Sequence, residues 1–244
     1  MTSNDLDLFG IQSVFRDFDN DGFVDLLLAG SDQRLFKNNG DGTFSRLPNP
    51  FSSNAMESYA VGDLNSDGYL DIYAGYANIF NSPSNIDDVL FINDGGTNNF
   101  FDVLLEGTDS NPNGIGARVE LHGSWGTQIR EVRSGESYGI MNSLRQHFGI
   151  GSATEIDSLV VRWPSGTVDE LSNPSINGQI TLVEGSASVQ LGDCNCDGDV
   201  DFLDIGPFIA ILSAGDYLAK ADMDLSGAVD FLDIGPFVAV LSVP

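Results

Sequence analysis

The stretch Asp17-Phe18-Asp19-Asn20-Asp21-Gly22-Phe23-Val24-Asp25-Leu26 decides the fold of the first part of the chain. It recurs 46 residues later as Asp63-Leu64-Asn65-Ser66-Asp67-Gly68-Tyr69-Leu70-Asp71-Ile72. Each copy is followed by an apolar run, and then by a second run that ends in Gly, Asn and Asp. Strand, acidic hairpin loop, strand and glycine turn are the order of elements in propeller blades. The sequence therefore predicts two β-sheet blades.

Oxygen-bearing residues alternate within each copy, so every second side chain of the tight loop faces one interior point. Calcium takes six to eight oxygen ligands in a tolerant geometry. A turn rich in Asp and Gly could serve conformation alone, but filling the same five positions twice favours calcium. Phe23 and Tyr69 are predicted to contribute main-chain carbonyls. The predicted ligands are Asp17, Asp19, Asp21, Phe23 and Asp25 in one loop and Asp63, Asn65, Asp67, Tyr69 and Asp71 in the other.

A second, unrelated repeat lies near the end of the chain. Residues 200–213 return 29 residues later as residues 229–242, with two Ile-to-Val changes, and the apolar spacing of each copy suits a short helix. The residues around the start of each copy follow the twelve-residue EF-hand spacing, with Asp at position twelve in place of the usual Glu. The predicted ligands, with Asp199 and Ala228 acting through carbonyls, are Asp193, Asn195, Asp197, Asp199, Asp201, Asp204, Asp222, Asp224, Ser226, Ala228, Asp230 and Asp233. The carboxylates packed into each loop repel one another when no metal is bound. A domain of about 50 residues buries too little apolar core to offset this repulsion, so we expect its folding to require calcium.

The residues between the two repeats have a different pattern. Residues 128–133 and 159–163 alternate as half-buried strands do, and Gly and Pro turns separate such stretches. We therefore predict a mainly β protein with a small C-terminal helical part. The predicted divisions are partial β-propeller blades (1–98), a compact all-β domain (99–185), a linker (186–191) and a paired EF-hand-like domain (192–244).

Composition supports the loop interpretation and excludes some partners. The net charge is −26, and 28 Asp stand against eight Glu; short carboxylates in excess suit tight cation-binding loops, although salt-adapted proteins also carry acidic surfaces. No basic stripe is present to bind nucleic acid, and no run approaches the roughly 18 apolar residues of a membrane span. The first residues lack the pattern of a secretory signal, so export would need a signal outside this chain. Cys194 and Cys196 are interpreted as incidental loop residues.

Three resemblances cover nearly the whole chain. Residues 12–98 resemble two FG-GAP (VCBS-type) blades of integrin α-subunit propellers. Residues 99–185 resemble the ASPIC/UnbV domain of cartilage-acidic-protein-like proteins through residues 113–119, 130–132, 147–151 and 161–166. Residues 192–244 are similar to type I dockerins, which dock onto cohesin modules of extracellular scaffolds. A closed propeller would need more than two blades, and Pro207 and Pro236 fall where cellulosomal dockerins carry an uninterrupted helix.

These observations predict a non-catalytic, secreted or cell-surface protein that binds about four Ca²⁺ ions. The resemblance implies a cohesin-type or other extracellular protein as partner. Loop positions ten and eleven, which in dockerins often hold small hydroxyl residues, hold Phe202-Leu203 and Phe231-Leu232. The near-identity of the two C-terminal copies predicts two equivalent docking faces. A recent duplication is the alternative explanation of that near-identity.

Two other functional classes remain open. The chain could be an accessory or truncated part of a secreted polysaccharide-degrading enzyme, for which Glu131, Glu136, His147 and His122 are the imaginable acid–base groups. We interpret His147 as structural instead. The chain could also be a carbohydrate-binding module, and the aromatic side chains available for stacking on sugars are Trp125, Tyr138 and Trp163.

Overall fold

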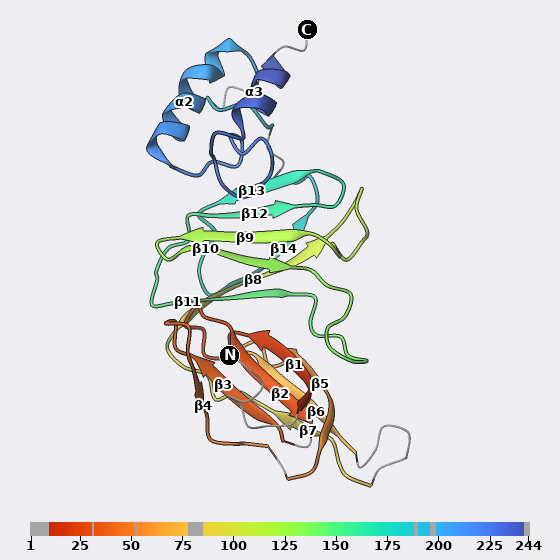
Figure 1. Ribbon diagram of the computed structural model, residues 1–244. Coiled ribbons are helices and arrows are strands. Elements are labelled where there is room, and N and C mark those ends of the chain that lie inside the picture. The colour runs from red at the N-terminus through yellow and green to blue at the C-terminus, as the bar shows by residue number, and fades with distance from the viewer. Residues whose placement is uncertain are drawn as a thin grey trace.

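The computed structural model describes residues 10–30, 32–51, 53–77, 85–187, 190–195 and 199–241. Three units follow one another along its length (Figure 1). Strands β1 to β7 form the blade unit at one end, strands β8 to β14 form the middle domain, and helices α2 and α3 belong to the C-terminal module at the other end. The mainly β architecture with two short helices agrees with the predicted fold class.

The blade unit consists of two antiparallel sheets, with strand orders β1-β2-β3-β4 and β5-β6-β7. The strands are β1 (Gly10–Arg16), β2 (Asp25–Gly30), β3 (Arg34–Asn38), β4 (Phe44–Arg46), β5 (Met56–Gly62), β6 (Asp71–Tyr76) and β7 (Val89–Phe91). The apolar runs predicted to follow the acidic loops are β2 and β6. Side chains such as Leu27, Tyr59 and Ile72 pack into one core between the sheets. The described strands thus form two neighbouring blades and no closed ring.

The middle domain is a sandwich of two sheets, with strand orders β10-β9-β12-β13 and β11-β8-β14. Its strands are β8 (Asn99–Glu106), β9 (Arg118–Gly123), β10 (Gly126–Glu131), β11 (Gln146–Gly151), β12 (Ser158–Arg162), β13 (Val168–Ser172) and β14 (Gly178–Val183). β14 runs parallel to β8, and the other pairs are antiparallel. Phe101, Leu121 and Phe148 are among the fully buried side chains that fill the space between the sheets.

The expectation of a half-buried strand at residues 159–163 is wrong, because every residue of β12 is buried. Val160 points away from the sandwich core and packs with Val168, Ala219 and Tyr217 in a separate apolar cluster. Two of those residues belong to the C-terminal module. The outer face of β12 is therefore covered by the C-terminal module and not by solvent.

The C-terminal module contains the 3-10 turn η1 (Phe202–Asp204) and the helices α2 (Ile205–Ala214) and α3 (Ile234–Leu241). The two predicted short helices are confirmed. Phe208 and Phe237, which are equivalent in the repeat, stack with ring centroids 4.1 Å apart and an interplanar angle of 6°. Pro207 and Pro236 each stand third in their helix, where the main-chain N–H has no partner within the helix. Neither proline therefore interrupts a helix.

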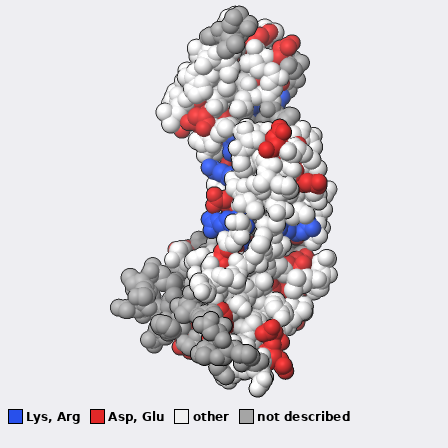
Figure 2. All heavy atoms as spheres, turned by 90° about the vertical axis from the view of Figure 1, so that its right-hand side faces the viewer, with Lys and Arg blue, Asp and Glu red and all other residues white. Residues whose placement is uncertain are grey.

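The predicted linker begins as ordered chain attached to the middle domain. The Ala187 N–H donates to the buried Asp169 carboxylate over 2.8 Å, and the Glu170 N–H donates to the Ala187 carbonyl over 2.9 Å. On the face shown in Figure 2, basic side chains lie over the middle domain and its borders, whereas acidic side chains occur along the whole molecule.

Candidate calcium loops

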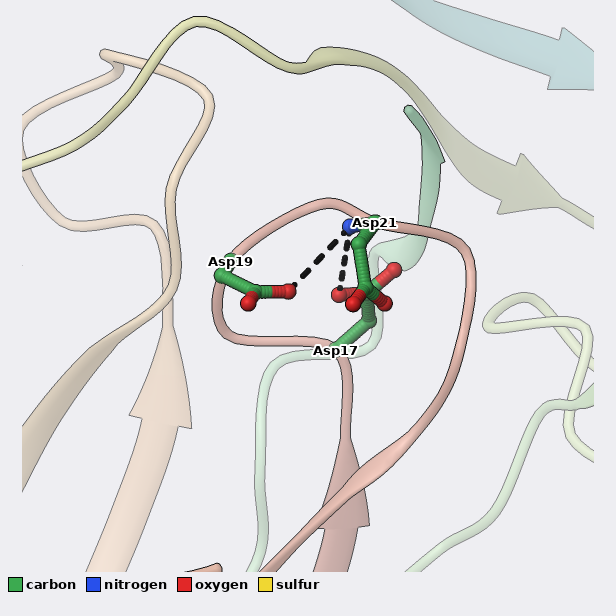
Figure 3. Close-up of side chains that lie close together, drawn as sticks. All are labelled: Asp17, Asp19 and Asp21. Atoms are coloured by element: carbon green, nitrogen blue, oxygen red, sulfur yellow. Dashed lines mark hydrogen bonds between the residues drawn. The ribbon is translucent and has the colours of Figure 1, made fainter. Parts of the chain in front are cut away.

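The first blade loop, residues 17–25, joins β1 to β2 and brings three predicted ligands together. One carboxylate oxygen from each of Asp17, Asp19 and Asp21 lies within 4.8 Å of the others, and Figure 3 shows the three side chains facing one another inside the loop. Main-chain N–H groups set this shape. The Asp21 N–H is shared between Asp17 and Asp19, over 3.2 and 3.3 Å, and the Gly22 N–H donates to Asp17 over 2.8 Å. Gly22 has a φ of 95°, which only glycine adopts without strain.

Asp25 stands apart from that group, although it was predicted as a fourth ligand. Its Oδ2 accepts the Phe18 N–H over 3.0 Å, and its Oδ1 accepts the Asn38 N–H over 2.8 Å. The carboxylate therefore ties both ends of the loop to β3. Phe23 donates its N–H to the Asp21 carboxylate over 2.9 Å, and its half-exposed ring lies against Gly40.

Crowding of carboxylates disfavours their ionised form in the first blade loop. Burial, together with the nearby charges of Asp21, Asp25 and Asp19, raises the pKa of Asp17 to about 7, although the Gly22 hydrogen bond acts in the opposite direction. Burial likewise raises the pKa of Asp25 to about 6. A cation bound among these groups would relieve the repulsion.

The second blade loop, residues 63–71, repeats this geometry with one carboxylate fewer. Asp63 accepts the Asp67 and Gly68 N–H groups over 3.2 and 2.9 Å, and Asn65 accepts the Asp67 N–H over 3.1 Å. Asp67 in turn accepts the Tyr69 N–H over 2.8 Å. Because position three is an amide, the described residues do not gather three carboxylates here.

Asp71 in the second blade loop repeats the role of Asp25. It accepts the Leu64 N–H over 2.9 Å and the Asn93 N–H over 2.8 Å, and so ties the loop to the residues after β7. In both blades, the carboxylate at position nine therefore joins the loop to a neighbouring strand or to the residues after it, by accepting two main-chain N–H groups.

The second C-terminal loop, residues 222–233, also gathers three carboxylates. Ligand oxygens of Asp222, Asp224 and Asp233 lie within 4.8 Å of one another. Asp233 is fully buried and accepts the N–H groups of Met223, Asp224 and Asp230 over 2.6, 3.0 and 2.8 Å. The Asp at position twelve thus connects the beginning and the end of the loop through hydrogen bonds from the main chain.

The other predicted ligands of the second C-terminal loop have different positions. Asp230 is exposed and accepts the Leu232 N–H over 2.7 Å, so it starts the following helical turn. Ser226 accepts the Ala228 N–H through its hydroxyl and donates to the Ala228 carbonyl, both over 3.3 Å. The Ala228 carbonyl predicted as a ligand is therefore engaged by Ser226.

The first C-terminal loop, residues 193–204, shows the same frame where it is described. Asp204 is buried and accepts the Asn195 and Asp201 N–H groups, each over 2.9 Å. Asp201 is exposed and accepts the Leu203 N–H, as its counterpart Asp230 does in the second copy. Asp197 and Cys196 lie outside the described residues, and Asp199 lies in the described loop. Cys194 is buried in the small core of the module.

Several basic side chains contact these loops, and the sequence did not predict any of these contacts. Lys37 on β3 bonds to Asp19, and to Asp21 over 2.7 Å. Lys220 bonds to Asp193 over 2.9 Å, and Arg162 of the middle domain bonds to Asp222 over 2.5 Å. Lys37 and Lys220 are the only lysines of the chain. In a chain with so many aspartates and only two lysines, each lysine could have been expected to lie beside a cluster of carboxylates.

The blade loops are seated on the middle domain. Asn20, at the tip of the first blade loop, donates to the Gly68 carbonyl over 2.8 Å, and its amide oxygen lies 2.6 Å from His147 Nε2. His147 Nδ1 lies 2.7 Å from the buried Asp102 carboxylate. The predicted structural role of His147 agrees with this position. The Gly151 N–H donates to the Asn20 carbonyl over 2.8 Å.

Glycine is required where β11 meets the first blade loop. A Cβ on Gly149 would lie 2.1 Å from Asp17 Oδ2 and 2.4 Å from Asn20 Cα. The stretch His147–Gly151, which carries part of the ASPIC/UnbV resemblance without an assigned chemistry, therefore forms the seat of this loop.

At the opposite end of the middle domain, arginine side chains contact the second C-terminal loop. Arg162 bonds to Asp222, to the Tyr217 hydroxyl over 2.7 Å and to Glu120 over 3.1 Å. His122 stacks on Tyr217 with ring centroids 4.4 Å apart. Burial raises the pKa of Asp222, and the Arg162 guanidinium acts in the opposite direction. A second arginine, Arg118, contacts the loop at the Ser226 carbonyl over 3.4 Å.

The residues considered for catalysis are engaged in ion pairs or buried contacts. Glu136 accepts from Arg16 of the blade unit and from Asn142, and Glu131 pairs with Arg133 over 3.2 Å. His122 lies 3.6 Å from the buried Glu120. Glu131 and Glu136 line one cleft of about 590 Å³ between the blade unit and the middle domain.

The aromatic residues considered for sugar stacking differ in exposure. Trp163 is buried, and its indole N–H donates to Asp169 over 2.7 Å, so it serves the core. Trp125 is partly buried and packs against the sandwich core. Tyr138 is 71% exposed. Of these three, only Tyr138 presents its ring to solvent.

Family models match two segments of the chain. Residues 17–74 match the FG-GAP-like repeat, and residues 107–189 match the ASPIC and UnbV family. The chain therefore carries an FG-GAP-like repeat followed by an ASPIC/UnbV domain. FG-GAP-like repeats are typical of extracellular proteins. Among the described residues, no helix has the length and apolar character needed to cross a membrane.

Whole-chain comparisons add little. No curated protein sequence matches the chain. One solved structure, a type II cohesin–X-dockerin complex from Acetivibrio cellulolyticus, is 13% identical over 57% of this chain and 93% of its own, with a TM-score of 0.23. A likeness at that level carries no argument about fold or partner.

Proposed function

We propose that the protein is a non-catalytic, extracellular interaction protein that binds about four Ca²⁺ ions and docks to a protein partner through its C-terminal module. Calcium is supported by the geometry of the loops. Two groups of three carboxylates converge within 4.8 Å, and the loops offer carboxylate, amide and carbonyl oxygens, which are the ligands that calcium prefers. The basic side chains that contact the loops support the same proposal, because they place positive charge beside these carboxylates.

The calcium proposal is tested by native mass spectrometry of the whole chain. Four ions would move the formal charge from −26 to −18, because they add eight positive charges. We expect four bound ions at millimolar calcium, and one fewer in each of the variants Asp21→Asn and Asp224→Asn. Asp94→Asn, outside the loops, is the matched control. Fewer than three ions in the unmodified chain would show that the blade loops are not calcium sites.

Docking is supported by the exposed apolar side chains of the C-terminal module. Phe202 and Phe231 are 76% and 81% exposed, and Leu203 and Leu232 next to them are exposed as well. The stack of Phe208 on Phe237 shows that the two helices meet about equivalent positions. The two apolar pairs therefore stand on related faces, and large exposed apolar side chains of this kind are typical of protein-binding surfaces.

A panel of purified cohesin modules tests docking. Replacing Phe202 and Leu203 by Ser and Thr should leave binding nearly intact, because the second pair substitutes, whereas replacing all four residues should abolish it. Lost binding after the first change alone would indicate a single dedicated face. Absence of binding by the unmodified chain to every module would reject a cohesin partner.

A second candidate function is carbohydrate binding, which one surface pocket favours. Tyr138 and the half-exposed Tyr73 line a pocket of about 320 Å³ together with Glu57, Ser58 and Asp88. The Tyr73 hydroxyl donates to Asp88 over 2.9 Å. Aromatic rings beside hydrogen-bonding groups are suited to sugars, because a ring face stacks on C–H groups while the polar groups meet hydroxyls.

A glycan array tests this candidate function. Tyr138→Ala should reduce any signal at least tenfold, and Tyr138→Phe should retain it, because the phenyl ring still stacks. A signal unchanged in Tyr138→Ala would place carbohydrate binding elsewhere or exclude it. Turnover assays on chitin, cellulose and sulfated polysaccharides test the alternative of an enzyme component, and we expect no product.

A further inference from the structure

The carboxylate oxygens of the first blade loop fall into two sets. Asp19 Oδ1 accepts the Asp21 N–H, and Asp21 Oδ1 accepts the Phe23 N–H, so these oxygens shape the loop. The Oδ2 atoms of Asp19 and Asp21 receive no main-chain N–H that the structure shows. Both of them contact the Lys37 ammonium. Lys37 therefore occupies the oxygens that a bound cation would use.

The second blade loop provides a natural comparison for this arrangement. Asn38 and Asn93 are equivalent, because their N–H groups meet Asp25 and Asp71 in the same way. The residue before Asn38 is Lys37, whereas the residue before Asn93 is Ile92. The loop that has four aspartates thus has a lysine beside it, and the loop in which Asn65 replaces one aspartate has none.

The Arg162 contact does not have this geometry. Arg162 bonds to Asp222 Oδ2, the same oxygen that accepts the Gly227 N–H over 2.8 Å. Asp17 and Asp63 likewise use Oδ2 for the N–H of the loop glycine. Arg162 therefore shares an oxygen that already accepts a main-chain N–H, whereas Lys37 bonds to oxygens for which the structure shows no main-chain donor.

We propose that Lys37 is a tethered cation that fills the first blade loop in the absence of calcium and must leave before calcium binds there. This inference rests on the proposed calcium function. If Lys37 acts in this way, the two blade loops differ in their affinity for calcium. The first loop stays neutralised and folded at low calcium and binds the ion weakly, whereas the second binds without displacing a competitor.

The chemistry of the lysine suits this exchange. The lysine ammonium is a compact charge with three N–H donors, and it contacts both Asp19 and Asp21. Its flexible stem extends from the half-buried end of β3, and the side chain is 35% exposed. The ammonium can therefore move to solvent while the strand stays in place.

The test measures calcium binding by the whole chain with isothermal titration, using Lys37→Met. Arg34→Met is the matched control, because Arg34 lies on the same strand and its removal changes the net charge equally, while its guanidinium contacts the Gln33 carbonyl. The binding step lost in Asp21→Asn identifies the first blade loop. We expect Lys37→Met to tighten that step about tenfold, since binding no longer competes with an occupied state, and Arg34→Met to change it less than twofold.

Thermal unfolding supplies a readout that a merely structural lysine would not give. In EGTA, Lys37→Met should lower the melting temperature, because four carboxylates lose their counter-charge. In millimolar calcium, the variant should melt at or above the temperature of the unmodified chain. The reciprocal variant Ile92→Lys should weaken the second blade site.

The outcomes separate this inference from the function on which it rests. Equal calcium affinity in Lys37→Met and Arg34→Met, with the first loop binding in both, would overturn the tethered cation and leave the calcium function intact. A melting temperature lowered equally in EGTA and in calcium would also overturn it. No calcium step assignable to this loop in any variant would overturn both.

Discussion

The first blade loop and the second C-terminal loop each gather three carboxylates, yet the middle domain contacts them in different ways. The blade loop contacts the middle domain through main-chain atoms and through hydrogen bonds around Asn20 and His147, and its counter-charge comes from its own blade. The C-terminal loop is seated by arginines of the neighbouring domain. A shared spacing therefore specifies how carboxylates converge, but the surroundings decide what balances their charge and what else depends on it.

Calcium removal should produce the largest difference between the two regions. In EGTA, we expect amide hydrogens of α2 and α3 to lose most of their protection in exchange mass spectrometry, on the order of a hundredfold or more, because the core of the C-terminal module is small. The strands β2 and β6 should stay protected by the core between the blades. Equal protection of α2 and α3 with and without calcium would contradict the prediction.

Arg162→Met should release the C-terminal module from the middle domain. The change leaves the buried Glu120 and Asp222 without their shared cation, and breaking a buried pair in this way costs roughly 3–5 kcal/mol. We expect faster exchange in residues 217–222 and a larger radius of gyration in X-ray scattering. Arg46→Met, on the exposed end of β4, is the control. A variant that stays compact would show that the apolar contacts of Val160 suffice.

His147→Ala should loosen the other end by a smaller amount. It removes the group that joins Asp102 to Asn20, and leaving buried polar atoms unpaired costs about 1–3 kcal/mol. The free energy of unfolding in urea should fall by that amount both in EGTA and in calcium, since the contact lies outside the metal-facing oxygens. A loss seen only in calcium would instead make His147 part of the calcium site.

Acid should weaken the middle domain through one carboxylate that belongs to neither loop. Burial would raise the pKa of Glu184, but hydrogen bonds from Ser165, Ser110 and Thr108 lower it to about 2. The folded state therefore binds the proton less tightly than the unfolded state, so this stabilisation is present above about pH 4.5 and is lost as the pH falls toward 2. Glu184→Gln should be less stable at neutral pH and show a shallower loss of stability across that interval. An unchanged slope would contradict the assignment.

Short-range patterns in the sequence predicted the elements well. The alternating aspartates predicted the paired acidic loops, and the apolar runs behind them predicted β2 and β6. The spacing around Phe208 and Phe237 predicted two short helices, and the prolines were compatible with them because each lies in a first turn. All of these features depend on neighbours within one turn or one hairpin.

The contacts between units could not be predicted in the same way. His147 and Asn20 are 127 residues apart, and Arg162 and Asp222 are 60 apart. Such pairs depend on how whole sheets dock, which no local period encodes. The same reason explains why β12 was expected to be half-buried, since its second cover comes from a different unit. The main-chain N–H groups that Asp25 and Asp71 accept from other strands were likewise not predicted, since they too depend on how the strands pack.

The seating of acidic loops at both ends of the middle domain has a mechanical consequence. Each joint between units is made by a loop whose shape depends on how its carboxylates are neutralised. An ion that enters or leaves such a loop would therefore change the bending stiffness of the joint beside it, even where no strand is altered. At low calcium the joint at the blade unit would stay stiff, because Lys37 then neutralises its loop, whereas the joint at the C-terminal module would loosen.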